Sequence, residues 1–267
     1  MTDRPRLTGY TSTGWRGRWI PASMLVLLAA CGLGVDDAER LARAERFHAE
    51  GNYQAEIIEL KNVLKNDPVN LEARVRLGQS SLAAGDPASA VKEFRRAVEL
   101  GANAGDFRLD YVDALLAVGD ANGALELARG AGEVDAAQAA RLGAAEAEAH
   151  LLLDDPGGAR AALDAVAGSG DAAVEVRMAH AGLAMAEGRV AEARAMLAEM
   201  ESEAGDQVRY WERRASLALR AGEPTAAIAA YDRAIAEASR LTFGMQAFLL
   251  QAGLVDAYLA DGDTENA

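Results

Sequence analysis

Few side chains in this sequence have the types and spacing that a catalytic or metal-binding site requires. No two of the three histidines, His48, His150 and His180, lie three to five residues apart beside further ligands, as in a zinc site. The sequence also contains no serine nucleophile elbow, phosphate loop or dinucleotide-binding fingerprint. It therefore predicts a protein that is not an enzyme, with no catalytic residues, no cofactor, no metal site and no small-molecule substrate.

Acidic residues stand directly before proline where three of the second helices are expected to begin, at Asp86-Pro87, Asp155-Pro156 and Glu223-Pro224. Paired catalytic carboxylates are one interpretation of such acids. Each acid, however, follows a break in the pattern, where its side chain can cap the free amides of a helix whose first turn is preset by proline. Helix capping is therefore the interpretation that we adopt.

One candidate for covalent modification is Cys31, the only cysteine, which follows Leu28-Ala29-Ala30. A basic segment precedes an apolar stretch from Ile20 to Ala30, which is too short for the roughly 20 residues that span a bilayer. This order is typical of an export signal. Leu-Ala-Ala-Cys resembles a bacterial lipoprotein box, so residues 1–31 are predicted to be a signal peptide and Cys31 the site of lipidation. A chance cysteine at the end of a hydrophobic run is the alternative.

The sequence after residues 1–31 has a regular repeat. A glycine or aspartate expected to open a small turn recurs at intervals of 34 or 35 residues, with a longer last interval of 40. These residues are Gly51, Gly85, Gly119, Asp154, Gly188, Gly222 and Gly262. The period is that of a tetratricopeptide repeat, a pair of antiparallel helices that must stack on its neighbours. We therefore expect an all-α fold, a right-handed TPR superhelix or α-solenoid.

The expected domain organisation is a short tether at 32–36 and about six and a half repeats over 37–267. The repeat ranges are 37–70, 71–104, 105–139, 140–173, 174–207, 208–247 with an insertion around residues 239–245, and an incomplete 248–267. Because the array stops within a repeat whose apolar face would be exposed, we expect it to be the amino-terminal piece of a longer protein.

Small or apolar residues occupy equivalent places in the repeats, where helices approach closely. On the first helices these places hold Ala44, Gly78, Val112, Ala147, Ala181, Ala215 and Val255; on the second helices they hold Ala90, Ala124, Ala159, Ala193, Ala227 and Ala267. The exception is Glu56, whose carboxylate must turn outward or find a partner. The first repeat is therefore expected to be a looser cap.

The acidic composition limits the choice of partner. The formal net charge is −14, and it becomes more negative without residues 1–31, which hold four arginines and one acid. Nucleic acid and anionic lipid surfaces both attract the opposite charge. We therefore expect no nucleic-acid partner, and a membrane attachment only through lipid on Cys31.

First helices of this repeat class line the inner curve, so their residues form a candidate partner-binding groove. The twelfth positions give an apolar stripe, Leu82, Leu116, Leu151, Met185, Leu219 and Leu259, and neighbouring positions add Gln79, Asp113, Glu148, Ser216 and Arg220. Arg141, Arg209 and Glu212 also fall on this face. Such a surface suits an extended or amphipathic protein segment. Alternatively, the stripe is core between repeats.

The segment IIELKNVLKNDPVNLEAR, residues 57–74, and the segment LGQSSLAAGDPASAVKEFRRAVELGA, residues 77–102, carry a family resemblance. They are similar to the opening repeats of TPR-repeat lipoproteins associated with PEP-CTERM and exosortase systems. The resemblance covers about residues 41–102. It implies a longer array in a setting of exopolysaccharide production and protein sorting.

The sequence thus predicts an exported, lipid-anchored scaffold for protein–protein interactions in the bacterial cell envelope. Gly32 after the cysteine, in place of aspartate, resembles lipoproteins of the outer membrane that face the periplasm. Two alternatives stay open. One is a periplasmic assembly factor for a secretion or outer-membrane complex. The other is the substrate-selecting region of an enzyme whose catalytic domain lies downstream of residue 267.

Overall fold

The structure is a computed structural model that describes residues 36–130, 134–168, 174–204, 207–241, 245–263 and 265–266. Cys31, the predicted signal peptide, nearly all of the tether and Ala267 lie outside the described residues. The segment 37–267 forms one compact unit, to which all the helices below belong.

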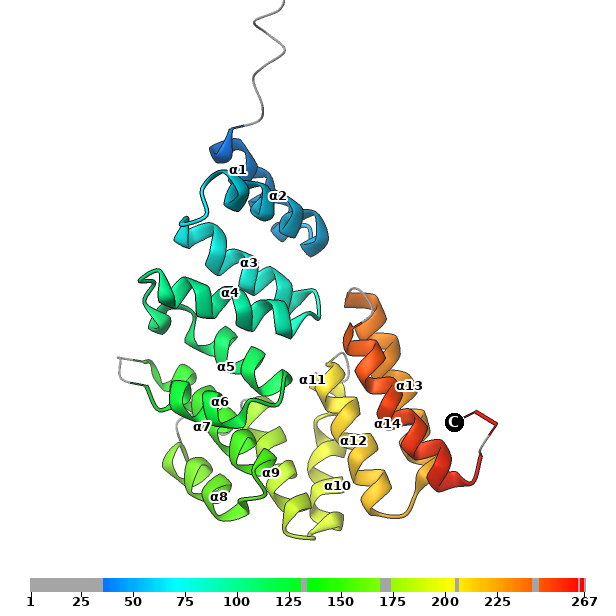
Figure 1. Cartoon of the computed structure of the whole chain (residues 1–267). Helices are drawn as coiled ribbons and strands as arrows, with labels where there is room; N and C mark the ends of the chain where they lie inside the picture. Colours follow the sequence, from blue (N-terminus) through cyan, green and yellow to red (C-terminus); the bar gives the residue numbers. More distant parts are fainter. Residues whose placement is uncertain are drawn as a thin grey trace, which may run out of the picture. The chain divides into compact units, whose positions relative to one another are not determined.

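All regular secondary structure in the described ranges is helical, and the helices follow one another as antiparallel pairs (Figure 1). The first helices of the pairs are α1 (Asp37–Ala49), α3 (Leu71–Ala83), α5 (Arg108–Ala117), α7 (Ala136–Leu152), α9 (Val174–Ala186), α12 (Val208–Arg220) and α14 (Met245–Asp261). The second helices are α2 (Tyr53–Asn66), α4 (Pro87–Glu99), α6 (Ala121–Ala128), α8 (Pro156–Ala165), α10 (Val190–Glu199) and α13 (Pro224–Leu241). Two short helices, η2 (Ala104–Phe107) and α11 (Glu201–Ala204), join consecutive pairs.

Each pair packs on the next one along the chain. A first helix contacts its own second helix and the second helix of the preceding pair, as α3 contacts α4 and α2. First helices also pack on one another from α3 to α5, α7, α9, α12 and α14. The first helices therefore form a continuous wall, which positions the site described below.

The periodic turn residues all end a first helix in the same way. Gly51, Gly85, Gly119, Asp154, Gly188, Gly222 and Gly262 all have positive φ. In each turn this residue's amide bonds a carbonyl three residues back, and the next amide bonds one five residues back, as in Gly119 to Leu116 and Asp120 to Leu115. This is the Schellman arrangement, which favours glycine. The predicted turn positions are thus confirmed, and Asp154 is the one non-glycine residue among them.

A glycine swap tests this turn geometry. Gly119→Ala is expected to lower the free energy of unfolding by about 1 kcal/mol, because φ is +79° and an added Cβ strains a left-handed backbone. Gly157→Ala, in the first turn of α8, is the matched control. It is expected to raise stability by about 0.5–1 kcal/mol, because the alanine restricts the unfolded chain in an ordinary helical conformation. Urea unfolding checks both values, and equal effects of the two substitutions would contradict the assignment.

Capping acids begin several second helices. Asp86 accepts a hydrogen bond from the amide of Ser89, and Asp155 accepts one from the amide of Gly158. Both helices have proline in the first turn, as expected. Glu223 precedes Pro224 at the start of α13, and its carboxylate accepts from Arg194 at 2.8 Å.

The predicted small positions form the interior between helices. Ala44, Val112, Ala147, Ala181 and Ala215 on the first helices are fully buried, and Gly78 is buried among them; on the second helices Ala90, Ala124, Ala159, Ala193 and Ala227 are fully buried. Val255 is different, with 36% of its surface exposed. Its helix, α14, packs against α12 and α13, and the residue of α14 that these contacts bury fully is Ala257, two residues further along.

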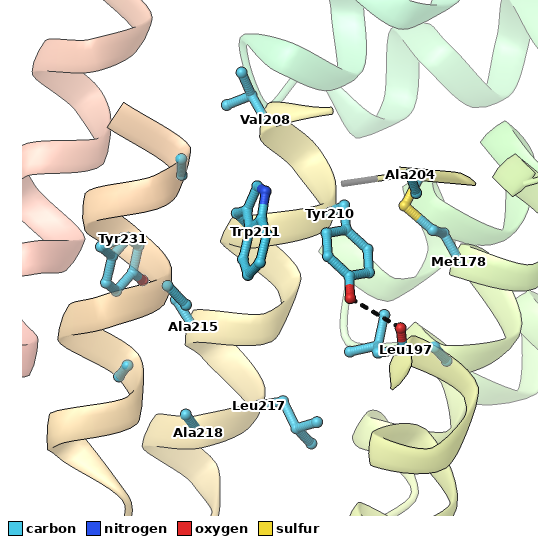
Figure 2. Packing of buried hydrophobic residues seen from close by; sticks show 14 of the residues in the cluster. Met178, Leu197, Ala204, Val208, Tyr210, Trp211, Ala215, Leu217, Ala218 and Tyr231 are labelled. Atoms are coloured by element: carbon cyan, nitrogen blue, oxygen red, sulfur yellow. Dashed lines mark hydrogen bonds between the residues drawn. The ribbon is translucent and has the colours of Figure 1, made fainter. Parts of the chain in front are cut away.

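Larger side chains fill the space around these small ones. Figure 2 shows the cluster around α12, where Tyr210 is fully buried and donates a hydrogen bond of 3.0 Å to the carbonyl of Leu197. The Trp211 ring meets the Tyr210 ring edge to face at 5.1 Å. Tyr210 thus ties α10 to α12, and Trp211 contacts α13, where the guanidinium of Arg233 lies 5.2 Å from the centre of its ring.

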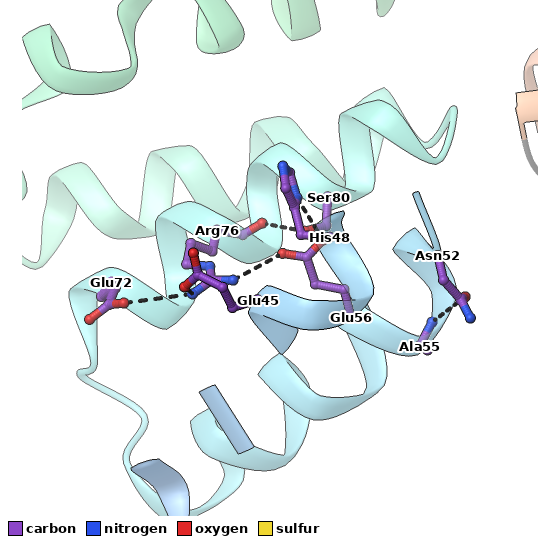
Figure 3. Close-up of polar contacts among 8 residues, drawn as sticks. All are labelled: Glu45, His48, Asn52, Ala55, Glu56, Glu72, Arg76 and Ser80. Carbon is purple, nitrogen blue, oxygen red and sulfur yellow. Dashed lines mark hydrogen bonds and ion pairs between the residues drawn. The ribbon is translucent and has the colours of Figure 1, made fainter. Parts of the chain in front are cut away.

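Glu56 stands where the later second helices carry alanine. It is only 1% exposed, and its oxygens lie 3.0 Å from His48 Nδ1 and 3.5 Å from Arg76 Nη2 (Figure 3). Leu60 and Val63 beside it are fully buried. The carboxylate therefore finds partners inside the fold, and the first pair has a closed interior, in contrast to the looser cap expected.

Two expected repeat limits differ from the helices. Helix α7 begins at Ala136, ahead of the limit expected at residue 140, and α14 begins at Met245, ahead of residue 248. Helix α13 has 18 residues, whereas α4 has 13. Part of the 40-residue interval between Gly222 and Gly262 therefore lengthens this second helix. None of the helices described here is both long enough and apolar enough to cross a lipid bilayer.

Candidate functional site: a cavity along the first helices

The first helices enclose an open cavity of about 710 Å³. Helices α3, α5, α7, α9, α12 and α14 all contribute to its wall. Its lining residues are Leu82, Gly85, Pro87, Asp113, Leu116, Ala117, Arg141, Glu148, Leu152, Glu175, Met178, Met185, Gln207, Arg209, Glu212, Arg213, Ser216 and Leu250. The cavity thus combines apolar side chains with a set of charged ones.

The predicted apolar stripe reaches the cavity only in part. Leu82, Leu116 and Met185 line it. Leu116 and Met185 are 7% and 6% exposed, so most of each side chain packs between helices. Leu116 and Met185 therefore belong both to the core and to the cavity lining.

The other members of the stripe lie elsewhere. Leu151 packs into the core cluster of α7, α8 and α9, and Leu219 packs against the cluster around α12. Leu259 is 55% exposed on α14. Leu152 takes the place of Leu151 in the lining, because adjacent residues point in different directions around a helix of 3.6 residues per turn.

The predicted polar residues are divided in the same way. Asp113 and Glu148 line the cavity. Gln79 instead donates a hydrogen bond to Asp110 at 2.8 Å, and Arg220 donates one to the carbonyl of Met185 at 3.3 Å. Both are used to join neighbouring first helices. Of the further residues expected on this face, Arg141, Arg209, Glu212 and Ser216 all line the cavity.

The centre of the charged set is Glu148 on α7. It accepts hydrogen bonds from Arg213 and, at 3.2 Å, from Arg209, both on α12. Helix α9 lies between these helices in the stack. Gly182 on α9 makes the contact possible, since a Cβ there would fall 2.1 Å from Nη1 of Arg213. Arg213 therefore passes over a glycine to reach a helix two pairs away.

A second group of charges lies beside the first. Arg141 on α7 stands 3.7 Å from Asp113 on α5 and 3.6 Å from Glu175 on α9. One guanidinium thus faces two carboxylates on the two flanking helices. Glu212 on α12 has no Lys, Arg or His nitrogen of the described residues within ion-pair distance.

The local fields shift the pKa values of these groups in opposite directions. Burial alone would raise the pKa of Glu148, but the charges of Arg209 and Arg213 lower it below its ordinary value. Glu148 raises the pKa of Arg209. In contrast, partial loss of hydration beside the cavity raises the pKa of Asp113 and of Glu212, and the nearby arginines only partly offset this rise. The fold therefore favours an ionised Glu148 and disfavours ionised Asp113 and Glu212.

This difference predicts that Asp113→Asn increases stability at pH 7. Folding raises the pKa of Asp113 above its ordinary value of 3.8. Ionised Asp113 therefore destabilises the folded state, and this cost grows as the pH rises from 3.8 through the raised pKa. Removing that charge removes the cost, while Arg141 keeps Glu175 as a partner. The melting temperature should exceed that of the wild type at pH 7, and the difference should shrink as pH falls toward 3.8.

Asp232→Asn on the exposed face of α13 is the control for this change and should have little effect at either pH. The groups that act on Asp113 are Arg209, Arg141, Glu148 and Asp110. A lower melting temperature of Asp113→Asn at pH 7 would show that these arginines stabilise the ionised form more than burial opposes it.

Sequence reasoning missed part of the lining, including Glu175, Met178, Gln207 and Arg213. The helical periodicity could have placed Arg213 on the cavity face, because it lies one turn after Arg209 on α12. Its partner 65 residues away had no signal in the sequence. Within the described ranges, no group of three or more His, Cys, Asp or Glu side chains is gathered as a metal site would require.

Comparison with known proteins gives likenesses of fold. One similar solved structure is a tetratricopeptide repeat protein from Parabacteroides merdae, with a TM-score of 0.53, 16% identity, and coverage of 87% of this chain and 90% of that one. Another is a thermophilic TPR protein of Thermus thermophilus, with a TM-score of 0.48, 22% identity, and coverage of 69% and 100%. No family model and no curated protein matches this chain. The paired helices, their turns and the first of these likenesses together show that the fold is an all-α tetratricopeptide solenoid.

Proposed function

We propose that this chain is a scaffold that holds a segment of another protein in the cavity of its first helices. The observation that carries the proposal is the cavity itself, about 710 Å³ in volume and lined from six first helices. Its lining offers Leu116, Met178 and Met185 as apolar contacts, together with a set of charged groups. Apolar anchors with charged edges suit an extended or amphipathic segment.

A photo-crosslinking residue at Ser216 tests this function in the native cells. Ser216 lines the cavity, whereas Glu126 is exposed on the second helix α6 and serves as the control position. The proposal expects protein adducts at 216 and none at 126. Adducts at neither position, or the same adducts at both, would contradict it. The identity of an adduct would also distinguish an exopolysaccharide or sorting protein from a component of a secretion machine.

We further propose that the scaffold is attached to the cell envelope through lipid on Cys31, in the outer membrane facing the periplasm. The support is the sequence alone: the basic segment, the short apolar stretch and Leu28-Ala29-Ala30-Cys31. The resemblance of residues 41–102 to lipoproteins of exosortase systems supports a link with exopolysaccharide production and protein sorting.

Cys31→Ser is expected to move the protein from the membrane fraction to the soluble fraction. Lipid chains contribute about 0.8 kcal/mol for each buried methylene, and their loss removes that attachment. Fractionation followed by immunoblotting measures the change, and Ser23→Ala within the apolar stretch is the control. A Cys31→Ser protein that stays tightly bound to membranes would contradict the lipid anchor.

A further inference from the structure

The charged residues of the cavity do not balance one another. Its lining contains four carboxylates, Asp113, Glu148, Glu175 and Glu212, and three guanidiniums, Arg141, Arg209 and Arg213. This excess lies within a chain whose formal net charge is −14. An occupant that enters the cavity therefore meets a negative local field on a negative protein.

Internal pairing occupies the arginines. Arg209 and Arg213 both bond Glu148, and Arg141 stands within 4 Å of Asp113 and Glu175. An anionic occupant would have to displace one of these carboxylates from its arginine. A cationic occupant needs no such displacement. It can approach those of the four lining carboxylates whose charge the arginines neutralise least.

Two of those carboxylates are Asp113 and Glu212. Glu212 lies outside ion-pair distance of every described basic side chain. Asp113 has only Arg141 within that distance, at 3.7 Å, and Glu175 approaches the same guanidinium equally closely, at 3.6 Å. The raised pKa values of both acids agree with this geometry. They stand on α5 and α12, and Leu116 and Ser216 lie on these same helices in the lining.

We propose that the cavity selects a basic protein segment, whose lysine or arginine side chains reach Asp113 and Glu212 while its apolar side chains contact Leu116 and Met185. This inference rests on the proposed function, because it names the chemistry of the segment that the same cavity holds. Charge complementarity gives such a site its selectivity.

Three synthetic amphipathic peptides test the selectivity. They share one leucine spacing and carry lysine, glutamine or glutamate at the polar positions. Fluorescence anisotropy measures their binding to the purified full-length chain at about 0.1 M salt, where the screening length is about 10 Å. The lysine peptide is expected to bind at least about tenfold more tightly than either of the others.

Two variants separate the cavity from the general charge of the surface. Asp113→Asn with Glu212→Gln is expected to weaken lysine-peptide binding about tenfold and to leave glutamine-peptide binding unchanged. Asp232→Asn with Glu126→Gln removes the same charge from exposed positions on α13 and α6, outside the cavity lining. That control is expected to change binding less than about twofold, because exposed charges are screened.

Equal weakening by both double variants would overturn the inference, since surface charge alone would then explain the preference. Equal binding of all three peptides, or tighter binding of the glutamate peptide, would overturn it too. If none of the peptides binds while Ser216 forms adducts in cells, the basic-segment inference fails and the scaffold function stands. If Ser216 forms no adducts, the scaffold function itself fails.

Discussion

Phe94→Ala is expected to lower the free energy of unfolding by about 3–5 kcal/mol, the largest effect that we predict for a single substitution. The Phe94 ring is fully buried and stacks on Phe107 with ring centres 5.2 Å apart. Its other neighbours include Tyr111, at 5.4 Å, and the backbone of Gly78. The ring thus joins α3, α4, η2 and α5, and its removal leaves a cavity between two consecutive helix pairs.

Urea unfolding followed by circular dichroism measures this loss. Phe94→Leu is the graded control and is expected to cost about 1–2 kcal/mol, because leucine fills part of the space. Gly78 offers a second check. A Cβ there would fall 2.6 Å from the Phe94 ring, so Gly78→Ala should cost less in the Phe94→Leu background than in the wild type. A cost below about 1 kcal/mol for Phe94→Ala would contradict a tightly packed junction.

Glu148→Gln is expected to lower the free energy of unfolding by about 2 kcal/mol at pH 7. The substitution leaves Arg209 and Arg213 without their common carboxylate, and removing one partner of a buried pair costs about 3–5 kcal/mol. The side chains here are 14–36% exposed, and water that reaches the two arginines reduces the expected cost. The stabilisation by Glu148 also depends on pH, because folding lowers the pKa of this carboxyl group. The stabilisation is complete above the ordinary pKa of 4.5 and is lost as the pH falls through the lowered pKa.

A double-mutant cycle of Glu148→Gln with Arg213→Gln isolates the contact. The two changes together should cost about 1 kcal/mol less than their sum, because either one alone breaks the same bond. Glu192→Gln, which breaks a solvent-exposed pair between α10 and the preceding Arg189, is the control and should cost much less than Glu148→Gln. Strict additivity of the cycle would show that the contact between α7 and α12 contributes nothing to stability.

The fold could be predicted from the sequence because its determinants are local. A left-handed turn tolerates glycine and, less often, aspartate, so Gly51 and its six equivalents mark where each first helix ends. Small residues such as Ala90 and Ala124 then fix which faces pack. Val255 follows the same pattern but stays partly exposed, since burial depends on a neighbouring element that the pattern alone cannot supply.

The site was less predictable because its contacts are not local. The helical register indicated the correct face, and Leu116, Asp113 and Glu148 were found on it. The pairing of Glu148 with Arg213 across 65 residues depends on how three successive pairs are arranged, and no spacing in the sequence encodes it. The predicted stripe contained Leu151 and not Leu152. The two residues are adjacent on α7, but Leu151 packs in the core whereas Leu152 lines the cavity.

The arginine that crosses Gly182 has a consequence for how the array unfolds. Repeat proteins are usually described by intrinsic repeat energies and by interfaces between adjacent repeats alone. The bond between Arg213 and Glu148 adds a coupling that skips the pair between them. Unfolding that starts at α14 is therefore expected to slow at α12, because opening the pair of α12 also breaks its bond to the pair of α7, which is not its neighbour in the array. Hydrogen exchange should consequently show α7 and α12 opening together, as one cooperative block inside an otherwise stepwise array.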